Sequence, residues 1–154
     1  MNVPISNLKF QNHIIYMYLL KIIKGKIILK GQKSVYFFQK LHNLVHISQY
    51  FYVSFPYFLT FSILNIVPFL KLYKTKVHKK SKKKIEKVKQ ISVITGVNIA
   101  VNWIFENISN SKSFESFILD FFFELCDAFF KTGKIYQKKF DYYKQCLDTR
   151  FFIK

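Results

Sequence analysis

The stretch ISQYFYVSFPYFLTFSILNIVPFL, residues 47–70, followed by KLYKTKVHKKSKKKIEKVK, residues 71–89, decides the fold of this chain. The first part has no charged residue in 24 positions, and the second has ten lysines and one acid, Glu86. An uncharged run of this length is typical of a membrane span with a basic flank. The same lysines on a β-hairpin would instead bind nucleic-acid phosphates. The two interpretations require different folds.

Proline favours the second interpretation. In the interior of a span, Pro56 would remove a helical hydrogen bond and clash with the preceding turn, whereas a helix tolerates proline as its first residue. In a helix that starts at Pro56, the core stripe is Leu59, Ile63, Ile66 and Val67. Thr60 and Asn65 are polar positions off that stripe, and Pro68 ends the helix. We therefore expect a loop and a short helix. An organellar membrane protein with a span over 47–70 and a basic flanking loop is the alternative.

After Pro68 the helical spacing stops, and residues 69–77 alternate lysines with strand-forming residues. Residues 85–93 are the expected partner strand, which gives a basic β-hairpin over 69–93. Its tip, 79–84, contains five lysines that repel one another. The tip is either a solvated loop or a basic finger that orders on RNA.

Helices are predicted on both sides of the hairpin. Apolar residues repeat at helical spacing from Ile14 to Ile23, in a helix that should end near Gly31, because glycine suits a C-terminal cap. A second helix starts at Ser34, and one of its faces carries Phe37, Phe38, Leu41, Leu44, Val45 and Ser48.

Three more helices follow the hairpin. The first begins after Gly96 and carries Trp103, and the second has Ser113 as N-cap and Gly133 at its end. The last has an apolar stripe at Tyr136, Phe140, Tyr143, Leu147 and Phe151. The expected fold is thus mainly α, a six-helix, bundle-like domain with one basic β-hairpin between helices three and four.

Composition points to an acidic partner. A chain of 154 residues fits a single domain, 1–154, in which we set residues 1–13 apart as an N-terminal extension. Its net charge of +17 attracts polyanions, most often nucleic acid. Phe, Ile, Lys, Asn and Tyr make up 81 of the residues, so the gene is rich in A and T, as organellar genes commonly are. Residues 1–11 lack the features of a cleaved targeting segment, which favours a protein that works where it is made.

The sequence offers little for catalysis or metal binding. Cys126 and Cys146 have no second pair and are expected to be buried thiols. His42 and His46 share a spacing that suits half a zinc site but have no third ligand nearby. The acids Asp120, Glu124 and Asp127 are expected on exposed helix faces. Without a phosphate-binding glycine loop or a nucleophile motif, we expect no enzyme, no metal and no cofactor.

The order of these elements resembles the ribosomal protein S-seven family of the small subunit. Five segments carry the resemblance: LKGQKSV at 29–35, FSILNIVP at 61–68, IAVNWI at 99–104, ELCDA at 124–128 and the basic closing helix from Lys138 to Phe152. Gln32 and Asn102 stand where the family usually has basic residues, and the hairpin tip lacks its glycine pair.

The resemblance implies a structural constituent of the ribosome. Such a protein binds and organises the three-prime domain of small-subunit rRNA, nucleates head assembly, and lies near the mRNA exit channel and the exit-site tRNA. Its partners would be rRNA, nearby mRNA and tRNA, and neighbouring head and platform proteins, without a membrane. Divergence from the bacterial-like pattern favours a mitochondrial ribosome, in the matrix, over a plastid one.

The candidate contacts are basic residues, which position phosphate without reading sequence. Those expected to bind rRNA are Lys24, Lys26, Lys30, Lys33, Lys71, Lys74, Lys76, Lys138, Lys139, Lys144 and Arg150. Those expected on the hairpin near tRNA and mRNA are Lys79, Lys80, Lys82, Lys83, Lys84, Lys87 and Lys89.

Overall fold

The computed structural model describes residues 5–47, 54–76, 84–109, 111 and 113–151. In these residues it contains α1 (Ile5–Leu29), α2 (Ser34–Ile47), α3 (Phe55–Ile66), β1 (Leu70–Lys76), β2 (Lys84–Gln90), α4 (Val93–Asn107), α5 (Phe114–Phe129) and α6 (Gly133–Phe151). The strands pair antiparallel. The prediction of a mainly α fold with one hairpin between helices three and four is confirmed.

The uncharged run divides at its prolines. Ser54 precedes α3, Pro56 is the second residue of the helix rather than the expected first, and the chain leaves the helix before Pro68. Residues 48–53 lie outside the described part of the chain. Within that part, none of the helices combines the length and the apolar character needed to cross a membrane.

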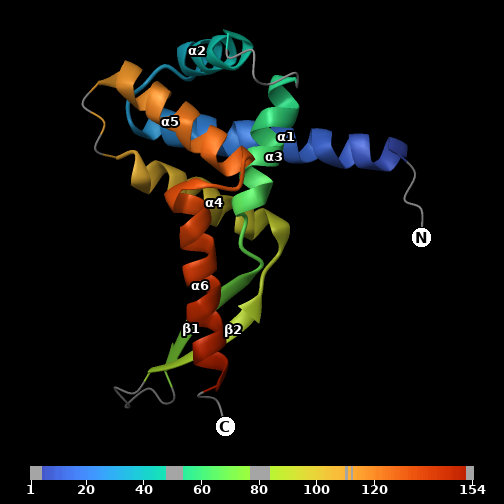
Figure 1. The fold of residues 1–154 in the computed structure, drawn as a ribbon, viewed down its shortest axis with the longest axis vertical. Helices are drawn as coiled ribbons and strands as arrows, with labels where there is room; N and C mark the ends of the chain where they lie inside the picture. The colour runs from blue at the N-terminus through green and yellow to red at the C-terminus, as the bar shows by residue number, and fades with distance from the viewer. Residues whose placement is uncertain (1–4, 48–53, 77–83, 110, 112, 152–154) are drawn as a thin grey trace.

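The third helix, α3, lies at the centre of the helical part and contacts each of the other five helices (Figure 1). Because neighbours surround it, burial extends beyond the predicted stripe. Thr60 and Ser62 are buried, so the expectation that Thr60 lies off the core was wrong. Asn65 is half-buried, and its Nδ2 donates to the carbonyls of Ala128 at 3.0 Å and Phe129 at 3.2 Å. It thereby caps the C-terminal end of α5.

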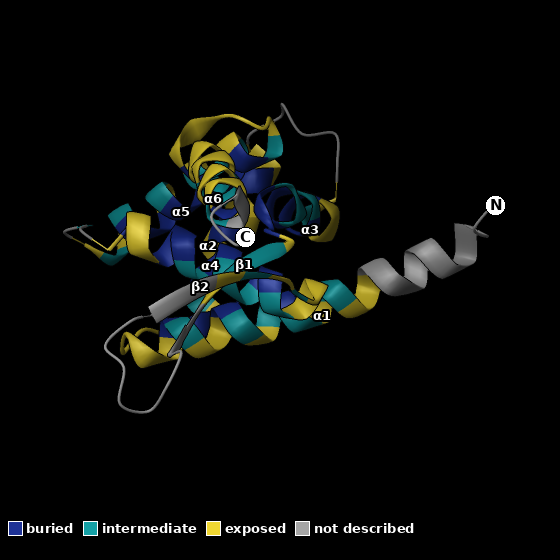
Figure 2. Ribbon diagram, turned by 90° about the horizontal axis from the view of Figure 1, so that it is seen from below, coloured by how far each residue is buried: buried dark blue, intermediate teal, exposed yellow. Residues whose placement is uncertain are grey.

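Phenylalanine rings fill the core between α2, α4 and α5. Phe121 is fully buried, and its ring centroid lies 5.2 Å from that of Phe37 and 5.7 Å from that of Phe105. Figure 2 shows that the buried surface is concentrated where the helices cross, while much of α1 and α6 is exposed. The core therefore holds the helices together and leaves long outer faces of α1 and α6 exposed.

The helix ends follow local signals, with one exception. The first helix ends at Leu29 with Gly31 at φ 75°, and the Gln32 N–H donates to the Ile27 carbonyl at 3.2 Å, as predicted for a glycine cap. The fifth helix ends before Gly133. There Lys131, at φ 59°, takes the left-handed position, and the Thr132 N–H donates to the Asp127 carbonyl at 2.8 Å. Gly133 instead begins α6.

Two further boundaries and the buried face of one helix differ from the prediction. The first helix begins at Ile5 and so includes part of the segment 1–13. The hairpin ends at Gln90, because Ser92 caps α4 and Val93 begins it. On α6 the core-facing side chains are Ile135 and Cys146, and Phe140 and Leu147 of the expected stripe are about half exposed.

Candidate nucleic-acid interface

The hairpin is fastened to α6 by two tyrosine hydroxyls. The Phe69 N–H donates to Tyr143 at 2.9 Å, and the Leu72 N–H donates to Tyr142 at 3.1 Å. Beneath them the Tyr142 ring lies edge-on to Trp103 of α4, with centroids 5.6 Å apart. In Figure 1 the two strands run alongside α6. Since a two-stranded hairpin is marginal by itself, these contacts fix its base on the helical domain.

Residue pairing divides the base of the hairpin into two faces. Leu72 is opposite Val88 on the half-buried face. On the other face Lys71 is opposite Lys89, and Tyr73 is opposite Lys87. We call these last four residues the hairpin lysine face. Two of its lysines, Lys87 and Lys89, are exposed, and the Lys71 Nζ lies 5.3 Å from the centre of the Tyr73 ring.

The hairpin lysine face lacks charge balance of its own. Like charges directly opposite on paired strands are destabilising, and Lys71 and Lys89 form such a pair. A phosphate bound between them would reverse the sign of this interaction. The pairing also joins Lys71, expected to contact rRNA, to Lys89, expected near tRNA and mRNA. The two predicted groups therefore share one face.

Two predicted RNA contacts on α6 have partners within the protein. Lys139 is half-buried, and its Nζ donates to the Asn65 carbonyl at 2.8 Å, so it caps the end of α3. Burial lowers the pKa of Lys139, and nearby Lys131 lowers it further. Lys138 pairs with Glu106 at 3.1 Å and lies over the Trp103 ring. Lys139 thus helps to hold α6 against α3, whereas Lys138 is exposed in spite of its partners and Lys144 is exposed as well.

The predicted lysines of α1 do not form one cluster. Lys26 and Lys30 lie over the Phe105 ring, each at 5.7 Å from its centre, and Lys30 is 4.6 Å from that of Phe117. Lys24 is two residues before Lys26, which places it about 200° away around the helix. It lines a groove beside α2 instead.

Lys30 also lines a polar hollow of about 360 Å³ at the start of α5. Lys33, three residues further along the chain, is exposed. The hollow is lined by Gln32 and by the serines Ser109, Ser111 and Ser113. Sequence analysis identified Ser113 only as an N-cap, a role that the structure confirms, since its Oγ accepts from the Ser116 N–H at 3.1 Å.

The side chains of the remaining predicted RNA-contact residues are not described in the structure. Lys79, Lys80, Lys82 and Lys83 lie outside the described residues. Lys74, Lys76 and Lys84 lie in the strands, Lys76 opposite Lys84, and Arg150 lies in α6; only their backbones are described.

The remaining candidate groups are the two cysteines and the acids of α5. Cys146 is buried as expected, but Cys126 is only half-buried, and desolvation and Asp127 raise its pKa to about 12. Asp120 and Glu124 are half-buried rather than exposed, whereas Asp127 is exposed as expected. Burial raises the pKa of Glu124, and Asn107 donates to one of its oxygens. Within the described part of the chain, no three His, Cys, Asp or Glu side chains are placed to hold a metal.

No family model matches the chain, and no curated protein matches it in sequence. The resemblance to the S-seven family therefore stays a prediction.

The sequence did not predict that Tyr142 and Tyr143 fasten the hairpin to α6. The only signal in the sequence was the adjacency of Tyr142 and Tyr143 within a lysine-rich helix.

Proposed function

We propose that this chain is an S-seven-like structural protein of an organellar small ribosomal subunit. It would bind the three-prime domain of the rRNA, nucleate assembly of the head, and place its hairpin near the mRNA exit channel and the exit-site tRNA. Neighbouring head and platform proteins would be its other partners. The AT-rich coding bias and the divergence from the bacterial-like pattern favour the mitochondrial matrix over the plastid.

The observation that carries the proposal is the hairpin lysine face, held on a helical domain by Tyr142 and Tyr143. A hairpin with lysines opposite one another and an anchored base suits binding to a phosphate backbone. The net charge of +17 would draw the protein to RNA. Lysines do not read base sequence, so recognition would come from the shape of an rRNA junction.

Sedimentation of an organelle lysate tests the proposal. The lysate is solubilised with detergent in magnesium, and this chain is quantified across the gradient with and without ribonuclease. We expect the chain to migrate with the small subunit and to leave that position when rRNA is digested. A chain that stays in a membrane-protein fraction whether or not ribonuclease is added would contradict the proposal.

Charge reversal tests the hairpin lysine face directly. Replacing Lys87→Glu together with Lys89→Glu should weaken binding to an rRNA three-prime-domain fragment by about tenfold or more, and should lower the slope of log affinity against log salt by about two. The control is Lys21→Glu with Lys40→Glu, which changes the net charge equally at exposed positions of α1 and α2. Equal losses in both double variants would mean that the protein binds RNA through its overall charge alone.

A further inference from the structure

A second surface, on the side of α1 next to α2 and α3, is unlike the hairpin because it is mainly apolar. A groove of about 670 Å³ runs between α1 and α2. Met17, Leu20, Val35 and Phe38 line it, and Met17 and Val35 are 54% and 69% exposed. We call it the α1–α2 groove. Its volume is in the range of natural binding pockets.

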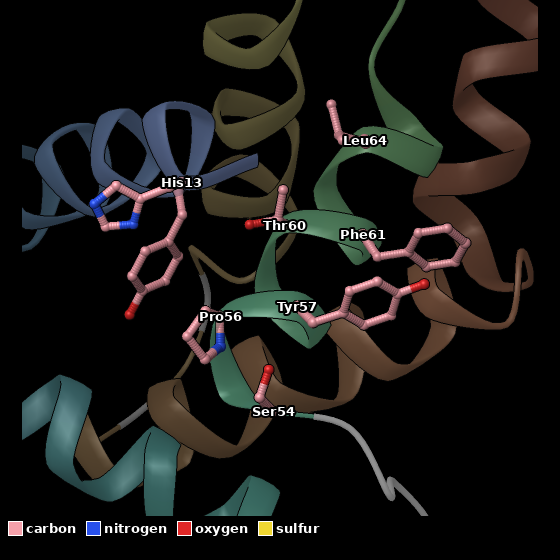
Figure 3. A pocket seen from close by; sticks show the side chains of 8 residues that line it. His13, Ser54, Pro56, Tyr57, Thr60, Phe61 and Leu64 are labelled. Carbon is pink, nitrogen blue, oxygen red and sulfur yellow. The ribbon is translucent and has the colours of Figure 1, made fainter. Parts of the chain in front are cut away.

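A smaller hollow of about 270 Å³ lies between α1 and α3, and Tyr16 lines both spaces. Figure 3 shows His13 on α1 at one side, Tyr57 and Phe61 at the other, and Thr60 between them with its hydroxyl directed toward α1. Tyr57 and Phe61 stack with centroids 5.6 Å apart, which gives the hollow an aromatic wall.

Thr60 gives this hollow a buried polar group. Its side chain is buried, and among the residues that the structure describes its Oγ1 has no hydrogen-bond partner. The neighbouring Ser62 differs, since its Oγ donates to the Phe58 carbonyl at 2.7 Å. Buried hydroxyls are usually paired, so an incoming polar atom at Thr60 would satisfy a group that the fold leaves unpaired.

The charge around the α1–α2 groove defines the partner. Lys21 and Lys24 line it, and the first acidic residue of the whole sequence is Glu86. From Tyr16 to Lys24 the helix rises about 12 Å, which matches two turns of a second helix. Apolar side chains along this length would stay exposed under a phosphate backbone but would be covered by a protein helix.

We propose that the α1–α2 groove and the adjoining hollow bind an amphipathic helix of a protein partner. The apolar face of that helix would cover Met17 and Val35, and its acidic residues would face Lys21 and Lys24. A tyrosine would enter the hollow beside Thr60. The inference goes beyond the proposed function and does not rest on it, because no residue of the hairpin lysine face takes part.

The test uses the full chain and a labelled, amidated 14-residue peptide with apolar residues at helical spacing, one tyrosine and flanking glutamates. We expect the peptide to bind about tenfold more tightly than a matched peptide with glutamine for glutamate. Lys21→Gln with Lys24→Gln in the protein should remove this difference. Thr60→Val should reduce the preference for the tyrosine peptide over a phenylalanine version.

Two surface variants complete the test. Val35→Glu should abolish binding of both peptides, while Val93→Glu, a matched change at an exposed valine of α4, should leave binding unchanged. Circular dichroism checks that each variant is folded. The proposal is overturned if the glutamate and glutamine peptides bind equally or not at all, or if Val35→Glu has no effect. Binding to anionic phospholipid vesicles that the glutamate peptide cannot displace would assign the groove to a membrane surface instead.

Discussion

Gly96→Ala is expected to lower the free energy of unfolding by about 2–4 kcal/mol. A Cβ atom at this position would lie 2.5 Å from the Pro68 carbonyl oxygen and 2.7 Å from the Val67 Cγ1. The valine can turn, but the carbonyl belongs to the short connection that leads from α3 into β1. The first turn of α4 can approach this connection only because residue 96 has no side chain. One added methyl group should therefore separate α4 from α3.

Chemical denaturation with urea checks this prediction, with Gly25→Ala as the matched control. Gly25 lies inside α1, and a Cβ there would meet no atom within 4 Å. Alanine is the better helix former, so this variant should be more stable than the wild type by about 0.5–1 kcal/mol. If alanine lowers the free energy of unfolding at Gly96 and raises it at Gly25, the loss at Gly96 comes from the close approach of Pro68 and not from helix propensity. A Gly96→Ala protein as stable as the wild type would show that α4 can shift away from Pro68 at little cost.

The helices and the hairpin could be predicted because their signals are local. Proline, glycine and serine act on the backbone of their own turn, and Pro56, Gly31 and Ser113 indicated ends that the structure has to within one residue. The end of α5 was misjudged for the same reason. Lys131 takes the left-handed conformation that follows the helix, although sequence patterns assign it to glycine. Gly133, which is also left-handed at φ 81°, lies two residues further along the chain and so indicated an end that is too late.

Side-chain environments depend on tertiary contacts, and there the sequence was a weaker guide. The stripe of α6 that faces the rest of the protein is Ile135, Lys139, Tyr142 and Cys146, at spacings of four, three and four. The sequence-based prediction placed Tyr136, Phe140, Tyr143, Leu147 and Phe151 on this face instead, because these five residues are all apolar or aromatic. Lys139 is half-buried because its ammonium group reaches the end of α3. Thr60 was misplaced for a similar reason, since nothing in its own turn shows that five helices surround α3.

For the candidate interface too, the sequence predicted the local features but not the tertiary contacts. Sequence identified basic residues as a class, because excess charge is visible in composition alone. Sequence spacing separates Lys24 from Lys26 around α1 but could not show that Lys24 lies beside α2 and Lys26 over the Phe105 ring. Nor could it show that Lys138 has Glu106 as a partner. It also could not show that Lys71 and Lys89 are opposite each other, since strand register depends on the turn between the strands. Charge predicted the kind of partner, and the fold placed the lysines.

Trp103→Ala should lower the free energy of unfolding by about 3–5 kcal/mol and release the base of the hairpin. Trp103 is only 8% exposed, and its ring supports Tyr142 from one side while Lys138 lies over it. Without the indole, Tyr142 loses the surface that holds its hydroxyl under the Leu72 N–H. Hydrogen exchange at Leu72, followed by NMR, should accelerate more than exchange in α5.

Tyr142→Phe separates the two effects of that substitution. It keeps the aromatic contact with Trp103 and removes only the hydroxyl that accepts from Leu72. The stability loss should be about 1 kcal/mol, but exchange at Leu72 should still accelerate. If Trp103→Ala left Leu72 as protected as in the wild type, the hairpin would be held by its own strand pairing. The lysines opposite one another make that outcome physically unfavourable, because the hairpin lysine face would then have to resist its own repulsion without support from α6.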